Sequence, residues 1–294
     1  MSDRIVGAWP WVVRAAWFVL PFTLGPLVGD GLADASAAVQ TTGLVLAWSL
    51  WGVGLVATLI FHPAGLVALR AATPLTVAAA VWSWVHGSPT AAIAALGLGS
   101  AVLAFVVMHS AETGHLAVNG PAYPNERRFL LRPSAVLLVG PIPLAGAVLA
   151  VGPVAGPLLL AARQWIAGGF ALVLGAGFAF VTARSLYAVA RRFVVFVPAG
   201  FVVHDQSTLR EPVLFRRQDI ESFRAAPAGS DSLDLTGGAP GLALEVLLRD
   251  KVEVTKVRGP RDIGETAKTA RFLIVPTRPG RLLATAAERR YPTG

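Results

Sequence analysis

The sequence predicts a bundle of about six transmembrane helices followed by a small β-rich domain that ends in a helix. The chain is 54% hydrophobic and only 14% charged, whereas charged residues make up about a quarter of a typical soluble domain. All eight tryptophans precede residue 166, and all three lysines follow residue 250. We therefore predict a membrane domain over residues 1–189 and a soluble domain over residues 190–294.

Six segments are apolar and most approach the roughly 20 residues that a bilayer requires. They cover residues 10–28, 41–61, 71–85, 90–108, 134–160 and 166–187. The first segment has an alternative interpretation as a cleaved signal peptide, because small residues follow it at positions 33–37. The third is short unless the part before Arg70 belongs to it, and its alternative is a re-entrant segment.

Prolines and small residues mark the last two segments. The fifth segment contains four prolines, at positions 141, 143, 153 and 157. Because proline removes a backbone donor and clashes with the preceding turn, we expect this helix to be kinked or broken. The sixth segment has a small residue at every fourth position from Ala167 to Ala183. Such a pattern lets another helix approach closely, and a homo-oligomer through this helix is a further expectation.

Arginines predict the orientation of the chain in the membrane. If all six segments cross, Arg70, Arg184 and the arginines around residue 130 lie on the same side as both termini. The loops on the other side contain Asp30, Asp34 and a single arginine, Arg163. The positive-inside rule therefore predicts an inner-membrane protein with the N-terminus and C-terminus in the cytoplasm.

Beyond residue 190 the pattern indicates antiparallel strands, with a period of two and turn residues between the runs. The predicted strands cover residues 192–197, 201–204, 212–215, 222–225, 242–248, 252–257 and 271–275. Residues 263–270 interrupt the pattern, and residues 280–290 suit a short helix that buries Leu282, Leu283 and Ala286. About 100 residues can bury a core, so we predict a small β-barrel or β-sandwich closed by a C-terminal helix.

Two stretches resemble a known family. Arg192 to Val195 leads out of the membrane segment toward Gly200 to Val203, and Leu214 to Phe223 holds a strand, an Asp-Ile turn and the next strand. In this order the last third of the chain resembles the bacterial pleckstrin-homology-like domains that follow transmembrane helices. The whole chain is similar to uncharacterised actinobacterial membrane proteins with an Asn-Glu-Arg-Arg-Phe loop, here Asn125 to Phe129. The resemblance implies a cytoplasmic binding or assembly module and names no substrate.

Basic residues beside the predicted spans are candidates for binding an anionic lipid headgroup or a protein partner at the cytoplasmic face. They are Arg127, Arg128, Arg132, Arg191 and Arg192. Each basic residue near an anionic membrane surface contributes about 1 kcal/mol to binding. The alternative is that these arginines are ordinary topology anchors.

A second cluster contains His109, Glu112 and His115, whose side chains are of the kinds that bind zinc. The spacing is poor, because the two histidines lie six residues apart around a helix and we expect Gly114 to end that helix between them. An interfacial helix end with a Glu-His contact is the alternative.

Residue types and motifs that the sequence lacks narrow the class of function that we predict. The chain has no cysteine, which excludes disulfides and thiolate metal sites. It lacks a P-loop, a His-Glu-x-x-His motif and a Gly-x-Ser-x-Gly elbow, so we expect neither an enzyme nor a cofactor. The net charge of +8 does not indicate nucleic acid, because the tryptophans lie in the apolar part. We predict a non-catalytic binding or assembly module, and the alternative is a small-solute transporter that uses the fifth segment.

Overall fold

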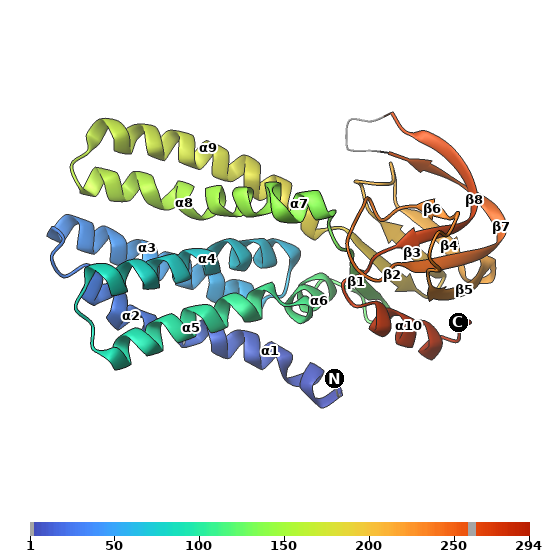
Figure 1. Cartoon of the computed structure of the whole chain (residues 1–294), viewed down its shortest axis with the longest axis horizontal. Helices are drawn as coiled ribbons and strands as arrows, with labels where there is room; N and C mark the ends of the chain where they lie inside the picture. The colour runs from blue at the N-terminus through green and yellow to red at the C-terminus, as the bar shows by residue number, and fades with distance from the viewer. Residues whose placement is uncertain (1–2, 258–262) are drawn as a thin grey trace. The chain divides into compact units, whose positions relative to one another are not determined.

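The computed structural model describes residues 3–257 and 263–294, and the chain in it forms two compact units (Figure 1). The helical unit comprises Met1–Gly120 and Ile142–Tyr187, and the β-rich unit comprises Pro121–Pro141 and Ala188–Gly294. The second part of the β-rich unit begins at Ala188, and the boundary was predicted at residue 190. The loop of residues 121–141 differs, because it belongs to the β-rich unit although it precedes the last two long helices.

Among the residues that the structure describes, six helical segments are long and apolar enough to cross a membrane, as predicted. They are Gly7–Gly31, Ala37–Leu59, Pro63–His86, Ala91–His109, Ala135–Ala161 and Trp165–Ala190. Their length and composition are those of a multi-pass membrane protein.

The structure lengthens the third predicted segment and divides the first. Helix α4 (Pro63–His86) is continuous over 24 residues, so the part before Arg70 does belong to this helix. The first segment consists of α1 (Asp3–Phe18) and α2 (Leu20–Gly31).

Close contacts at glycine hold the first helices together. The Trp17 side chain is buried against Gly54 of α3 (Ala37–Leu59), where an added Cβ would lie 2.1 Å from the indole ring. The Trp17 Nε1 also donates a hydrogen bond of 2.9 Å to the Trp51 carbonyl oxygen. On α5 (Ala91–His109), an added Cβ at Gly97 would lie 2.6 Å from Leu27 of α2. Glycine therefore makes the room that the larger side chains occupy.

Helices α8 (Pro141–Ala161) and α9 (Trp165–Ala190) lie antiparallel (Figure 1) and also pack closely at glycines. A Cβ added at Gly175 would lie 2.5 Å from the Gly152 carbonyl oxygen, and one at Gly152 would lie 2.6 Å from that of Gly175. The predicted close approach is thus confirmed at Gly175, where the neighbouring helix belongs to the same chain.

The fifth segment is broken near its beginning. The short helix α7 (Ala135–Val139) ends at Gly140, and α8 begins at Pro141. Pro153 and Pro157 lie inside α8. A break was predicted, but it lies close to one end of the segment rather than at its centre.

The β-rich unit has two four-stranded sheets and a C-terminal helix. The first sheet is antiparallel in the order β1 (Arg127–Leu130), β2 (Phe193–Val197), β3 (Gly200–His204) and β4 (Val213–Arg216). The second has the order β5 (Ile220–Ala225), β7 (Leu244–Lys256), β8 (Glu265–Ile274) and β6 (Leu233–Asp234). The one-turn helix η1 (Arg217–Asp219) joins the sheets, and α10 (Pro279–Glu288) follows the last strand.

Aromatic side chains from both sheets form one core with the C-terminal helix. The fully buried phenylalanines are Phe129, Phe196, Phe201, Phe215, Phe223 and Phe272. Leu282 and Ala286 of α10 are buried in the same core, as predicted, whereas Leu283 packs against it and is only partly buried. A β-rich unit closed by a helix is therefore confirmed.

Three details of the strands differ from the prediction. Strands β1 and β6 were not predicted. Residues 242–248 and 252–257 belong mainly to one strand, β7, whose pairing with β8 shifts register between Leu247 and Val252. Residues 265–270, predicted as an interruption, lie in β8 because they pair with the far half of β7.

Candidate binding site of the β-rich unit

Strand β1 brings two predicted site residues to an edge of the first sheet. It pairs antiparallel with β2, with Arg128 opposite Val195. The Arg128 Nη2 lies 2.8 Å from the Glu126 Oε2, and its guanidinium lies 5.1 Å from the centre of the Phe193 ring. Arg127 is exposed and donates a hydrogen bond of 3.0 Å to the Glu126 carbonyl oxygen. Arg127 thus presents its charge to solvent, whereas the charge of Arg128 is balanced locally.

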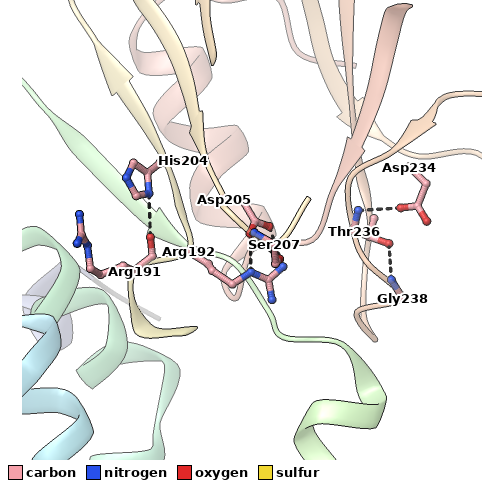
Figure 2. A network of polar contacts seen from close by, with 8 residues as sticks. All are labelled: Arg191, Arg192, His204, Asp205, Ser207, Asp234, Thr236 and Gly238. Atoms are coloured by element: carbon pink, nitrogen blue, oxygen red, sulfur yellow. Dashed lines mark hydrogen bonds and ion pairs between the residues drawn. The ribbon is translucent and has the colours of Figure 1, made fainter. Parts of the chain in front are cut away.

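Arg192 lies in the interior of the β-rich unit. It is 5% exposed, and its Nε and Nη2 each donate a hydrogen bond of 2.8 Å to the Asp205 carboxylate (Figure 2). The backbone N–H and the hydroxyl of Ser207 also donate to the Asp205 Oδ1, at 2.9 and 2.6 Å. Burial acts to raise the pKa of Asp205, but the hydrogen bonds and the charge of Arg192 lower it below its ordinary value. A buried carboxylate therefore occupies the guanidinium of Arg192, one of the predicted headgroup-binding residues.

Arg191 is exposed at the end of α9, beside His204 (Figure 2). The His204 Nδ1 lies 3.0 Å from the Arg191 carbonyl oxygen, so this nitrogen carries the donated hydrogen. The His204 ring stacks on Phe193 at 4.7 Å between centres. These contacts fix the backbone between the last long helix and β2.

Arg132 lies beside a glycine-rich loop. Its backbone N–H donates to the Val275 carbonyl oxygen at 2.9 Å, and its half-buried side chain passes Gly241. The loop is held by two short contacts, from the Thr236 N–H to the Asp234 Oδ1 and from the Gly238 N–H to the Thr236 Oγ1 (Figure 2). The Gly238 carbonyl oxygen in turn accepts from the N–H of Ala135, the first residue of α7. The loop therefore borders the beginning of the fifth segment.

A cluster of hydrogen-bond donors around one buried carboxylate was not predicted from the sequence. Glu245 of β7 is 0% exposed, and its Oε1 accepts hydrogen bonds of 2.6 and 2.5 Å from the hydroxyls of Ser230 and Ser232. Its Oε2 accepts from the Arg224 Nε at 2.7 Å. Burial acts to raise the pKa of Glu245, but these donors prevail and lower it to about 2. The cluster fastens the loop before β6 to the second sheet.

The predicted metal-ligand cluster lies in the helical unit. His109 is the last residue of α5, and its Nδ1 lies 3.0 Å from the Phe105 carbonyl oxygen. Glu112 and His115 lie on α6 (Ala111–Asn119), which begins after Ser110 and includes Gly114. The expected helix end at Gly114 is therefore wrong. Within residues 3–257 and 263–294, no group of three His, Cys, Asp or Glu residues is placed to hold a metal ion.

The five arginines predicted as a site differ in how far their side chains are exposed and in their partners. Arg127 and Arg191 expose their side chains, Arg132 is half-buried, and Arg128 and Arg192 form ion pairs.

The chain matches no protein-family model, no curated protein and no solved structure.

Proposed function

We propose that this chain is a multi-pass protein of the bacterial inner membrane whose pleckstrin-homology-like domain binds an anionic lipid surface on the cytoplasmic side. The two sheets and the closing C-terminal helix support the assignment of the β-rich unit to this kind of domain. A net charge of +7 supports an anionic ligand, with 20 Lys and Arg against 13 Asp and Glu over residues 121–141 and 188–294.

One observation carries the proposal: strands from both ends of the last helical hairpin lie side by side in one sheet. Strand β1 ends five residues before Ala135, where the fifth segment begins, and β2 begins three residues after Ala190, where the sixth ends. Leu130 pairs with Phe193 at this junction. Two short connections of this kind would hold the domain at the membrane surface and raise its effective concentration for surface ligands.

The same pairing bears on orientation. Because β1 and β2 belong to one sheet, the segments before α7 and after α9 must lie on the same side of any membrane that α8 and α9 cross. Arg127, Arg128, Arg132, Arg191 and Arg192 all belong to these two segments. The positive-inside rule would place that side in the cytoplasm.

Transport is the alternative, and the break between α7 and α8 is the observation in its favour. Transporters use such breaks near the bilayer midplane, where exposed backbone binds the substrate. Here the break lies at Gly140, near one end of the segment Ala135–Ala161. A groove of about 640 Å³ lies between α3 and the other end of α8, and its lining is uncharged. These positions favour surface binding over transport.

The lipid carried by the purified protein tests the proposal. Full-length protein is extracted in mild detergent, and its bound phospholipids are quantified by mass spectrometry. The variant Arg127→Ala/Arg191→Ala is expected to lose most of the bound anionic lipid. The control Arg210→Ala/Arg249→Ala removes two other exposed arginines and is expected to retain it. Equal lipid content in the two variants would contradict the proposal.

A further inference from the structure

A cationic and aromatic corner lies where α10 ends beside η1 in the β-rich unit. Arg217 belongs to η1, and Arg289 and Tyr291 follow α10 directly. The rings of Phe196 and Phe223 lie 5.6 and 5.5 Å from the Tyr291 ring. None of the residues predicted from the sequence as a site lies among these five.

Both guanidinium groups of this corner are held in place. The Arg217 guanidinium lies 4.8 Å from the centre of the Tyr291 ring, and its Nη2 donates to the Arg289 carbonyl oxygen. The Arg289 guanidinium lies 5.8 Å from the Phe196 ring, and its Nη2 donates to the Asn125 carbonyl oxygen at 2.7 Å. A guanidinium carries five N–H donors, so each arginine keeps donors for a ligand after making these contacts.

The charge of the two arginines is not neutralised by the protein. Arg128, Arg192 and Arg224 each lie within 4.0 Å of a carboxylate. Neither Arg217 nor Arg289 has a carboxylate within that distance anywhere in the part of the chain that the structure describes. Two fixed, uncompensated guanidiniums favour an oxyanion as their partner.

The Tyr291 hydroxyl is a further unused group. Tyr291 is 4% exposed, and its hydroxyl has no hydrogen-bond partner among the described residues. Burial raises the pKa of Tyr291, although the charges of Arg217 and Arg289 act to lower it. A buried hydroxyl without a partner destabilises the folded state, so a ligand that accepts its hydrogen bond would recover stability.

We propose that Arg217, Arg289 and Tyr291 form a binding site for a phosphate group. The planar guanidinium fork matches phosphate oxygens, and the phenol adds a neutral donor. The phosphate comes from a lipid headgroup or from free phosphate, since both present the same oxygens. This inference rests on the proposed function, because it assigns a ligand class and a site to the same binding domain.

Phosphate-dependent stabilisation of the full-length protein is the test. The protein is placed in nanodiscs of neutral lipid, and amide hydrogen exchange of β2, β5 and the residues after α10 is followed as inorganic phosphate is added. Nanodiscs that contain phosphatidic acid form the second arm. Protection in the phosphatidic acid arm alone identifies a lipid ligand, and protection by inorganic phosphate identifies free phosphate. No protection in either arm overturns the site.

Variants separate the site from general charge effects. Arg217→Gln/Arg289→Gln is expected to abolish the protection, whereas Arg216→Gln/Arg290→Gln removes the same charge from adjacent exposed arginines and is expected to retain it. Equal loss in both would overturn the proposal.

Tyr291→Phe keeps the inference testable if the arginine variants fail to fold. It keeps the ring and removes only the unpartnered hydroxyl, so without phosphate it is expected to be as stable as the parent or more stable. It is expected to weaken phosphate binding by roughly tenfold, the equivalent of one hydrogen bond. Unchanged phosphate affinity would overturn the role of the hydroxyl in the site.

If Arg217→Gln/Arg289→Gln loses phosphate binding but keeps co-purifying lipid, the two sites are separate. If phosphate never binds while Arg127→Ala/Arg191→Ala loses lipid, only this inference fails.

Discussion

The two units use arginine in opposite ways. In the helical unit, the Arg70 Nε and Nη2 donate to the carbonyl oxygens of Met108 and Ser110 at the end of α5, and the Arg14 Nε donates to the Thr58 carbonyl oxygen near the end of α3. In the β-rich unit, Arg192 and Arg224 bind buried carboxylates. Helix ends carry unpaired carbonyls and partial negative charge, so an arginine can be accommodated there without a buried acid. Loss of an arginine should therefore cost less in the helical unit.

The largest effect is expected for Arg192→Met. It leaves Asp205 buried without its partner, which costs about 3–5 kcal/mol. Amide hydrogen exchange of β2 and β3 reports on this unit, while the fluorescence of the eight tryptophans reports on the helical unit alone. Exchange should accelerate without a matching change in fluorescence unfolding. Arg191→Met, which removes the exposed neighbouring arginine, is the control, and an equal effect there would refute the role of the buried pair.

Acid should weaken the β-rich unit through Glu245. Its folded pKa of about 2 lies below the ordinary value. Its contribution to the free energy of unfolding is therefore fully present above about pH 4.3 and is lost as the pH falls toward 2. Glu245→Gln should lower stability at neutral pH by about 2 kcal/mol and flatten this acid dependence. The measurement is hydrogen exchange of β7 as a function of pH, corrected for intrinsic exchange rates. An unchanged acid profile in the variant would assign the loss to other carboxylates, of which Asp205 is the first candidate.

In the helical unit, packing should matter more than charge. Gly54→Ala places a methyl group against the Trp17 ring and is expected to lower stability by about 1–2 kcal/mol. Gly52→Ala on the same helix meets no atom within 4 Å and should leave stability nearly unchanged. Tryptophan fluorescence during thermal unfolding in detergent distinguishes the two. Equal melting temperatures would show that α1 moves freely away from α3.

The smallest effect is expected for Arg70→Met. Removal of this arginine leaves carbonyl oxygens at a helix end and no uncompensated acid, so the loss should be about 1 kcal/mol. The same fluorescence assay measures it. A loss as large as that of Arg192→Met would break the comparison between the two units.

The sequence predicted the elements whose signals are local. Apolar length alone located six segments, and period-two alternation located most of the strands. Strand β1 was missed because it has four residues and its partner β2 lies more than 60 residues along the chain. The apolar run Phe129 to Leu131 after the arginines, all three of them buried, was the available signal. Strand β7 was predicted as two strands because the charged residues Arg249, Asp250 and Lys251 separate its two alternating runs, although they lie within the strand.

The contacts of the predicted arginines could not be derived from the sequence, because a side chain's partner depends on the register of the strands. The strands predicted to begin at Arg192 and at Phe201 are separated by the turn residues Pro198 to Gly200, and this order already predicts a hairpin. In the observed register Phe193 pairs with His204, which places Arg192 next to Asp205. The corner of Arg217, Arg289 and Tyr291 had no comparable signal, because it joins η1 to the end of α10, more than 70 residues later.

The pairing of β1 with β2 also sets an order of events during synthesis. Strand β1 leaves the ribosome before α8 and α9 exist, and its neighbour appears only after both helices have been made. If α8 and α9 cross a bilayer as proposed, the first sheet would close only after this hairpin has crossed and returned. A hairpin that fails to return would then leave β1 with an unpaired edge, which is prone to aggregation.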